Sequence, residues 1–256
     1  MVYGDTSVLV NLWSKMQEKC LSKLVGMFSF VIFDKYEETL KLVTDGFGIK
    51  PMYYHKSECV VSSEIQPITR LIKSKLSVAK DIEQQYILTG EYDRNLRTFY
   101  QDIYRLPPGH LLKYCLKKSK VIDTLRWWYP STKTNHFRNI NDFCEELRTE
   151  FLESVKIHLR SDVPVGFALS GGLDSSSLVA AARYLHPKMD INAISYIPND
   201  QNLSEEKWID HIADQKNINV HKVRITSAQF IKDLPNLISS QGEPFGSSSI
   251  YAQYAV

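Results

Sequence analysis

A glycine-rich turn at residues 169–176 separates an apolar stretch from a helical pattern. Residues 163–169 are apolar and short enough for a buried strand, and residues 175–185 repeat apolar side chains at helical spacing. In a parallel sheet, a junction from strand to helix lies at the carboxyl end of the strand, where ligands bind. The sequence therefore predicts a ligand site at this turn.

The residues of the turn favour an anion, and a diphosphate in particular. Gly171 and Gly172 carry no side chains, so backbone N–H groups can point at a ligand, and the following helix presents its positive end. Asp174 adds a carboxylate, which repels a bare phosphate but can hold Mg²⁺ that bridges to it. We therefore expect a metal–pyrophosphate site, with a tight turn capped by Ser and Asp as the structural alternative. The full turn is Leu169, Ser170, Gly171, Gly172, Leu173, Asp174, Ser175 and Ser176.

Three other motifs do not fit this turn. It is not a Walker A loop, because no Gly-Lys-Ser or Gly-Lys-Thr follows the glycines. It lacks the G-x-G-x-x-G spacing of a dinucleotide fold, and Ala168-Leu169 before Ser170 does not match the G-x-S-x-G elbow of serine hydrolases.

The pattern of predicted secondary structure changes near residue 130. The first half indicates short strands and turns, whereas the second half alternates between helix and strand, which is typical of a parallel sheet with crossover helices. Pro235 is expected to end or kink the last helix. The expected strands are 26–33, 39–43, 52–54, 59–61, 110–114, 163–169, 191–197 and 220–225, and the expected helices are 65–72, 81–88, 143–159, 175–185, one following Ser204, and one beginning at 230.

Composition excludes several classes of protein. The 31 Lys and Arg against 29 Asp and Glu give a net charge of +2, which provides no general attraction to nucleic acid or acidic membranes. Lys113, Lys117, Lys118 and Lys120 form the densest basic patch, interpreted as a solvated hairpin end. No apolar run approaches the roughly 20 residues of a membrane span, so we expect a cytoplasmic protein that binds neither membrane nor nucleic acid.

The four cysteines lack the spacing of a metal site or a disulfide framework. They contain no C-x-x-C pair and have no histidine at ligand spacing. We expect them to be small core residues rather than nucleophiles. They are Cys20, Cys59, Cys115 and Cys144.

Ser170 to Ser176 resembles the PP-loop of ATP pyrophosphatases, and several longer blocks resemble glutamine-hydrolysing asparagine synthetases. The likeness extends over nearly the whole chain. The blocks are 26–30 (GMFSF), 45–54 (DGFGIKPMYY), 63–65 (SEI), 105–110 (RLPPGH), 161–166 (SDVPVG) and 242–247 (GEPFGS).

The resemblance implies two domains. Residues 1–126 would be part of a class II glutamine amidotransferase, an αββα sandwich of the N-terminal-nucleophile type, and 127–141 a connector. Residues 142–256 would be part of an α/β parallel-sheet PP-loop domain that binds ATP. In such a ligase, ATP and aspartate give β-aspartyl-AMP, which ammonia from glutamine converts to asparagine. The implied cofactors are ATP and Mg²⁺, the implied substrates are aspartate with glutamine or ammonia, and the full-length form would be a homodimer.

The resemblance also assigns roles to residues. The turn from Ser170 to Ser176 would hold the departing diphosphate, with Mg²⁺ on Asp174, an electrostatic contribution of the oxyanion-hole type. Leu169 would touch the nucleotide and Tyr196 would flank the adenine, with an ordinary strand aromatic as the alternative for Tyr196. Asp5 would contact glutamine, with a helix N-cap ahead of Ser7 as its alternative.

The sequence departs from this family in its first half. The family uses a Cys with a free α-amine as its nucleophile, but position 2 is Val2, so no catalytic residue is assigned. Thr44 stands where the family carries an Arg before Asp45. We expect the chain to be a fragment cut at both ends, poorly soluble and inactive alone. Two alternatives stay open: another PP-loop amide or lactam synthetase of secondary metabolism, and a non-catalytic nucleotide-binding paralogue.

Overall fold

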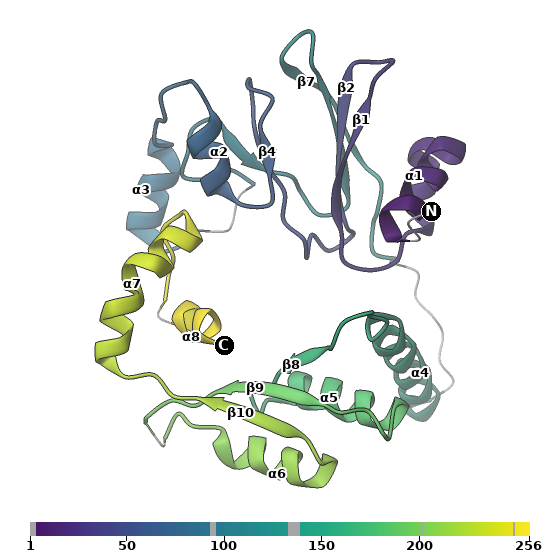
Figure 1. The fold of residues 1–256 in the computed structure, drawn as a ribbon, viewed down its shortest axis with the longest axis vertical. Coiled ribbons are helices and arrows are strands. Elements are labelled where there is room, and N and C mark those ends of the chain that lie inside the picture. Colours follow the sequence, from purple (N-terminus) through teal and green to yellow (C-terminus); the bar gives the residue numbers. More distant parts are fainter. Residues whose placement is uncertain (1–3, 93–95, 133–138, 201, 248) are drawn as a thin grey trace. The chain divides into compact units, whose positions relative to one another are not determined.

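The computed structural model describes residues 4–92, 96–132, 139–200, 202–247 and 249–256 (Figure 1). The protein is mixed α/β with several sheets and divides into two compact units. Unit 1 comprises Met1–Thr132 with Gln241–Gly246, and unit 2 comprises Lys133–Ser240 with Ser247–Val256. Part of the expected connector, residues 133–138, lies outside the described residues. None of the helices in the described part of the chain combines the length and hydropathy that a bilayer crossing requires.

Unit 1 contains two antiparallel sheets with helices on their outer faces. One sheet has the order β1-β2-β6-β7 and the other has the order β4-β3-β5. The elements are α1 (Asp5–Met16), the 3-10 helix η1 (Gln17–Lys23), β1 (Ser29–Asp34), β2 (Thr39–Thr44), β3 (Tyr53–His55), β4 (Val61–Ser62), α2 (Ile65–Leu71), α3 (Lys80–Thr89), β5 (Ile103–Arg105), β6 (His110–Cys115) and β7 (Lys120–Arg126).

Side chains alternate between the two faces of the larger sheet in unit 1, so each face packs against a different layer. Val43 and Leu111 point to one face of the larger sheet and pack with Trp13 and Leu21 of the first helices. Their neighbours Leu42 and Leu112 point to the opposite face and pack with residues at the start of β3 and the end of β5. The α2 helix then covers the smaller sheet through Ile65 and Ile68, which contact Ile103.

A segment from much later in the sequence completes unit 1. The Glu243 carboxylate accepts a hydrogen bond from the Phe99 N–H (2.6 Å), and the Tyr86 hydroxyl donates to the Phe245 carbonyl (3.1 Å). Burial raises the pKa of Glu243, and the hydrogen bond from the Phe99 N–H only partly opposes this rise. The block at 242–246 is therefore fixed by unit 1 although its flanking helices belong to unit 2.

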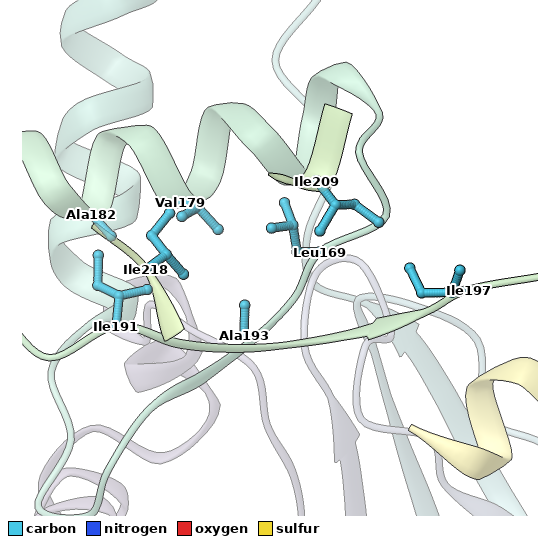
Figure 2. Close-up of a cluster of buried hydrophobic side chains, with 8 residues drawn as sticks. All are labelled: Leu169, Val179, Ala182, Ile191, Ala193, Ile197, Ile209 and Ile218. Atoms are coloured by element: carbon cyan, nitrogen blue, oxygen red, sulfur yellow. The ribbon is translucent and has the colours of Figure 1, made fainter. Parts of the chain in front are cut away.

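Unit 2 is built on a parallel sheet in the order β10-β9-β8. Figure 2 shows Val179 and Ala182 pointing from their helix toward Ile191 and Ala193, and Ile209 of the next helix joins the same cluster. This core places two helices on one face of the sheet. The elements are α4 (Ile140–His158), β8 (Gly166–Ala168), α5 (Leu173–Leu185), β9 (Asn192–Tyr196), α6 (Glu206–Lys216), β10 (Asn219–Val223), α7 (Ser227–Gln241) and α8 (Ser249–Ala255).

Several expectations about elements and burial were wrong. The strand expected over 163–169 is shorter, at 166–168. Of the two outcomes expected at Pro235, an end or a kink, the end is wrong, because α7 continues through Pro235 to Gln241. Cys20 is buried as expected and Cys115 is half-buried, but Cys59 and Cys144 are exposed, so the expectation of core positions was wrong for these two. The basic patch does lie at a hairpin end, because the turn between β6 and β7 carries Lys117 and Lys118.

Candidate functional site

The glycine-rich turn lies between the end of β8 and the start of α5, as the sequence predicted. Leu169 is buried at 1% exposure, and its N–H donates to the Ile194 carbonyl of the neighbouring strand (3.0 Å). This bond extends the parallel pairing to the edge of the turn. The backbone of Ser170 therefore leaves the sheet at its carboxyl end.

Two serine hydroxyls hold the turn in shape. The hydroxyls of Ser170 and Ser175 lie 3.0 Å apart, and the Ser170 N–H donates to the Ser175 Oγ (3.2 Å). The Ser175 hydroxyl also contacts the Gly172 carbonyl (3.3 Å), while the Gly172 N–H donates to the Ser170 Oγ (3.3 Å). These bonds close a ring of contacts around the turn, which fixes its conformation before any ligand arrives.

Gly171 is required by its backbone and by its surroundings. Its φ of +86° lies in the region that favours glycine, and a Cβ there would meet the Glu205 backbone oxygen at 3.1 Å. The first turn of α6 therefore approaches the glycine turn closely. A side chain at this position would separate the two segments and strain the turn.

The remaining residues of the turn differ in exposure. Leu173 is 82% exposed and Asp174 is exposed in the first turn of α5, so the Asp174 carboxylate is accessible to an ion in solvent. The Ser176 Oγ is buried and has no hydrogen-bond partner among the described residues. A helix N-terminus also carries N–H groups without helical acceptors, which suits an anion.

A cavity of about 1070 Å³ opens beside the turn. Its volume is slightly above the roughly 300–1,000 Å³ that small-molecule sites occupy. Leu169, Ser170 and Ser175 line one part, and Ile194 and Tyr196 of β9 line another. The other residues predicted for the turn, Gly171, Gly172, Leu173, Asp174 and Ser176, do not line the cavity. Asn199, Thr226, Phe230 and Tyr251 also line the cavity.

Sequence reasoning did not identify the contributions of α7 and α8 to this cavity. The segments after β9 and β10 reach the same sheet edge as the turn, and the Asn199 side chain donates to the Ile225 carbonyl (2.8 Å) and joins them. The rule that ligands bind at the carboxyl ends of parallel strands could have identified Thr226. The sequence carries no comparable signal for Tyr251, because α8 is distant along the chain.

Asp5 lies in unit 1 and is not part of this cavity. It is the exposed first residue of α1, and Gly4 is the N-cap, so the alternative interpretation of Asp5 as the cap was wrong. Thr44 is fully buried, and its hydroxyl donates to the Pro107 carbonyl (2.6 Å). The Thr44 hydroxyl is buried and uncharged, so it cannot form the ion pair with a ligand carboxylate that an arginine at this position could form.

The arrangement could hold a magnesium–nucleotide complex. Within the described residues, no group of three His, Cys, Asp or Glu side chains is placed to bind a metal ion. Magnesium that arrives on a nucleotide needs only one or two protein carboxylates, since phosphates and water supply the rest. The exposed carboxylate of Asp174, the two glycines and the serine hydroxyls match that requirement.

Two family models match this chain. The model for a glutamine amidotransferase domain matches residues 2–128, and the model for asparagine synthase matches residues 146–256. The two matches follow each other along the chain without overlap.

Curated relatives give a consistent comparison. Asparagine synthetase [glutamine-hydrolyzing] 1 of Bacillus subtilis is 28% identical over 256 residues, covering 99% of this chain and 39% of its own length. Asparagine synthetase [glutamine-hydrolyzing] 3 of the same organism is 27% identical over 258 residues, covering 91% and 41%. Amidase chry2 of Gibberella zeae is 30% identical over 190 residues, covering 71% and 27%. The chain therefore spans less than half the length of these relatives.

Proposed function

We propose, from the premise that this chain belongs to the family of glutamine-hydrolysing asparagine synthetases, that unit 2 activates a carboxylate with ATP and that unit 1 handles glutamine as the ammonia source. The reaction would convert aspartate and ATP to β-aspartyl-AMP and pyrophosphate. Ammonia would then displace AMP and give asparagine. The observation that supports this most directly is the serine-braced glycine turn, whose Leu169, Ser170 and Ser175 line the cavity of unit 2.

The turn would bind the β- and γ-phosphates, which leave together as pyrophosphate. The N–H groups of Gly172 and Ser176 already have acceptors inside the turn, at 3.3 Å and 3.1 Å. The first-turn N–H groups of Leu173, Asp174 and Ser175 would therefore provide the main backbone donors to phosphate. These groups are fixed before binding, so they can stabilise the charge that develops on the leaving diphosphate.

Asp174 would hold the magnesium ion that accompanies the nucleotide. Magnesium bridges phosphate oxygens and offsets their negative charge. The exposed position of the carboxylate in the first turn of α5 lets it reach an ion without displacing the turn. Leu169 and Tyr196 would contact the nucleoside portion, since both line the cavity beyond the serines.

Unit 1 would supply ammonia from glutamine, with Asp5 as a contact to the substrate. Its two sheets flanked by helices support the proposed N-terminal-nucleophile-type αββα sandwich. We place the functional domains at 1–126 and 142–256, joined by a connector at 127–141. The homodimer and the cytoplasmic location stay predictions.

Pyrophosphate exchange tests the proposal. The chain alone is expected not to make asparagine, but the turn that would bind ATP is present in full. In the presence of aspartate and magnesium, the protein should therefore still move labelled pyrophosphate into ATP, because adenylation is reversible. Asp174→Asn should reduce the exchange by at least about tenfold, since an amide is a poor magnesium ligand. Asp214→Asn removes an exposed carboxyl from α6 and should leave the exchange unchanged. Exchange that is insensitive to Asp174→Asn would contradict the metal role of that carboxylate.

A second candidate acceptor follows from the likeness to amidase chry2. The same turn could activate a carboxylate other than aspartate and make a different amide. Exchange measured with a panel of carboxylic acids separates the two functions. Dependence on aspartate supports asparagine synthesis, and dependence on another acid with no response to aspartate supports the second candidate.

A further inference from the structure

The connection between the last two helices of unit 2 is held by unit 1. The α7 helix ends at Gln241 and α8 begins at Ser249, and residues 242–246 between them, which we call the strap, group with unit 1. Gly242 follows the last residue of α7 with a φ of +71°, in the left-handed region that commonly ends helices. The chain therefore leaves unit 2 at the end of α7 and enters it again just before α8.

Three hydrogen bonds hold the strap along its length. Their donors are two tyrosine hydroxyls and one backbone N–H, all from residues 86–100 of unit 1. Two of the acceptors are backbone carbonyls, so most of this grip does not depend on the side chains of the strap. The bonds run from the Tyr100 hydroxyl to the Gly242 carbonyl (3.3 Å), from the Phe99 N–H to the Glu243 carboxylate (2.6 Å) and from the Tyr86 hydroxyl to the Phe245 carbonyl (3.1 Å).

Close packing gives the strap a defined seat. The Tyr86 ring meets the Phe99 ring edge to face, with 5.4 Å between the centroids, and this contact orients the Tyr86 hydroxyl. A Cβ on Gly246 would meet the Cε1 of Tyr92 at 2.8 Å, so the strap lies directly against this ring. The strap is therefore fixed by packing as well as by hydrogen bonds.

Both helices joined by the strap line the cavity of unit 2. The α8 helix has only seven residues, and so short a helix depends on its surroundings for stability. It lies against β9 (Figure 1), and its Tyr251 hydroxyl donates to Asp233 of α7 (2.7 Å). Residues 247 and 248 alone separate its start from the strap. The residues that line the cavity are Ser227 and Phe230 of α7 and Ser249, Tyr251, Ala252 and Gln253 of α8.

We propose, on the basis of the function proposed above, that the strap is a positioning element of the nucleotide cavity, and that Tyr86, Tyr100 and Glu243 hold α8 where it lines that cavity. These three are not among the described residues that line the cavity, so they act only through α8. Release of the strap would leave α8 with several positions, of which one completes the cavity. The apparent Kd for a ligand rises as the fraction of competent molecules falls.

The same relationship works in the opposite direction. If release of the strap weakens ATP binding by some factor, bound ATP must stabilise the seated strap by that factor, because coupling between two equilibria is reciprocal. Magnesium–ATP bound in unit 2 should therefore slow hydrogen exchange at the Phe99 N–H of unit 1, which donates to the strap. A strap that only completed the fold of unit 1 would not respond to the nucleotide.

The experiment loosens the strap without touching the cavity. The double variant Tyr86→Phe/Tyr100→Phe removes two hydroxyls and keeps both rings, and Glu243→Ala removes the acceptor of the Phe99 N–H. Glu243→Gln keeps an acceptor oxygen and is the rescue variant. Glu83→Gln is the matched control, because Glu83 lies in the same helix as Tyr86 and its carboxylate pairs with Lys80. The Kd for magnesium–ATP and the hydrogen exchange of residues 249–256 are measured for each, and thermal melting checks the fold.

The double variant and Glu243→Ala should each raise the Kd for ATP by about fivefold and speed exchange in residues 249–256. Exchange in residues 173–197, which contain α5 and β9, should stay as in the wild type. Glu243→Gln should remain within about twofold of the wild-type Kd, and Glu83→Gln should change neither measurement.

Two results would overturn the inference. Faster exchange confined to unit 1, with α8 and the Kd for ATP unchanged, would show that the strap only completes the fold of unit 1. Faster exchange in α8 with an unchanged Kd would show that the nucleotide does not need α8 in this place. A wild-type chain that does not bind magnesium–ATP would contradict the proposed function instead, and exchange in residues 249–256 would then decide by itself whether the strap holds α8.

Discussion

The Ser170 and Ser175 hydroxyls lie 3.0 Å apart across the glycine turn, and each also contacts the backbone of the turn. This pair explains how the six residues from Ser170 to Ser175, two of them glycine, keep one conformation at the end of a strand. Without the hydroxyls, the glycines would add backbone freedom that a ligand would have to restrict on binding. The serines therefore act on the shape of the turn as well as on its chemistry.

Ser175→Ala should weaken phosphate binding by removing three contacts at once. The loss of hydrogen bonds to Ser170 and Gly172 corresponds to about 1–2 kcal/mol, or about five- to thirtyfold in the Kd of magnesium–tripolyphosphate. Isothermal titration calorimetry measures this directly. Ser177→Ala, two residues further along α5, is the control. If both variants bind tripolyphosphate as the wild type does, the turn is not the phosphate site.

The part of the site that lies in one stretch of sequence could be predicted. The apolar strand, the two glycines and the helix after them are local signals, and the structure places the turn between β8 and α5. Leu169 and Tyr196 also lie at the cavity. The alternation of strand and helix in the second half predicted a parallel sheet, and the three strands do pair in parallel.

Other features depend on packing between distant segments, which one sequence does not reveal. The edge-to-face contact between Phe230 of α7 and Tyr251 of α8 depends on tertiary packing. Pro235 was expected to end or kink its helix, and the helix does not end there, because Leu237 beyond it is fully buried and packing of this kind overrides local propensity. The strands at 103–105 and 120–126 were missed, since β5 has only three residues and β7 exposes most of its side chains.

Asp45→Asn should destabilise unit 1. The buried Asp45 carboxylate accepts backbone N–H groups from Phe47 and Ile49 at Oδ1 (3.0 and 3.1 Å), and from Phe28 and Lys50 at Oδ2 (3.2 and 3.0 Å). An amide would keep one acceptor oxygen and turn an NH₂ group toward two donors. The expected loss is about 2–4 kcal/mol in the free energy of unfolding.

Urea unfolding followed by tryptophan fluorescence measures this loss, because three of the four tryptophans, Trp13, Trp127 and Trp128, belong to unit 1. Asp123→Asn, at an exposed position of β7, serves as the control for a change of charge. An Asp45→Asn protein as stable as the control would show that the loop does not depend on the carboxylate.

Arg183→Lys should destabilise unit 2 although the charge is kept. The guanidinium donates to the carbonyls of Lys216 (2.8 Å), Pro187 (2.9 Å), Met189 (2.7 Å) and Asn217 (2.7 Å). It thereby ties the end of α6 to the segment after α5. The ammonium of lysine cannot reach four carbonyls in this planar arrangement, so we expect a loss of about 2–3 kcal/mol.

Hydrogen exchange resolved by peptide locates the effect, which should appear as faster exchange in residues 183–219. Arg148→Lys is the matched control, because Arg148 lies over the Tyr184 ring (5.5 Å from its centroid) on an exposed part of α4. Exchange that rises equally in both variants would mean that the four carbonyl contacts carry no particular stability.

Glu58 should make the stability of unit 1 depend on acid. Its carboxylate accepts the N–H groups of Lys73 (2.8 Å) and Ser74 (2.9 Å), and these bonds lower the pKa of Glu58 to about 2, from an ordinary value of 4.5. A folded-state pKa below the unfolded value means that the contribution is complete above about pH 4.5 and is lost as the pH falls toward 2.

Glu58→Gln removes this ionisable group, so the wild type should be the more stable protein at pH 6.5, and the difference should shrink steadily between pH 4.5 and pH 2.5. Thermal melting at a series of pH values gives the two curves. Glu64→Gln, at an exposed position nearby, controls for the general loss of an acidic group. A difference between wild type and Glu58→Gln that stays constant over this range would contradict the assignment, because the hydrogen bonds to Lys73 and Ser74 would then be independent of ionisation.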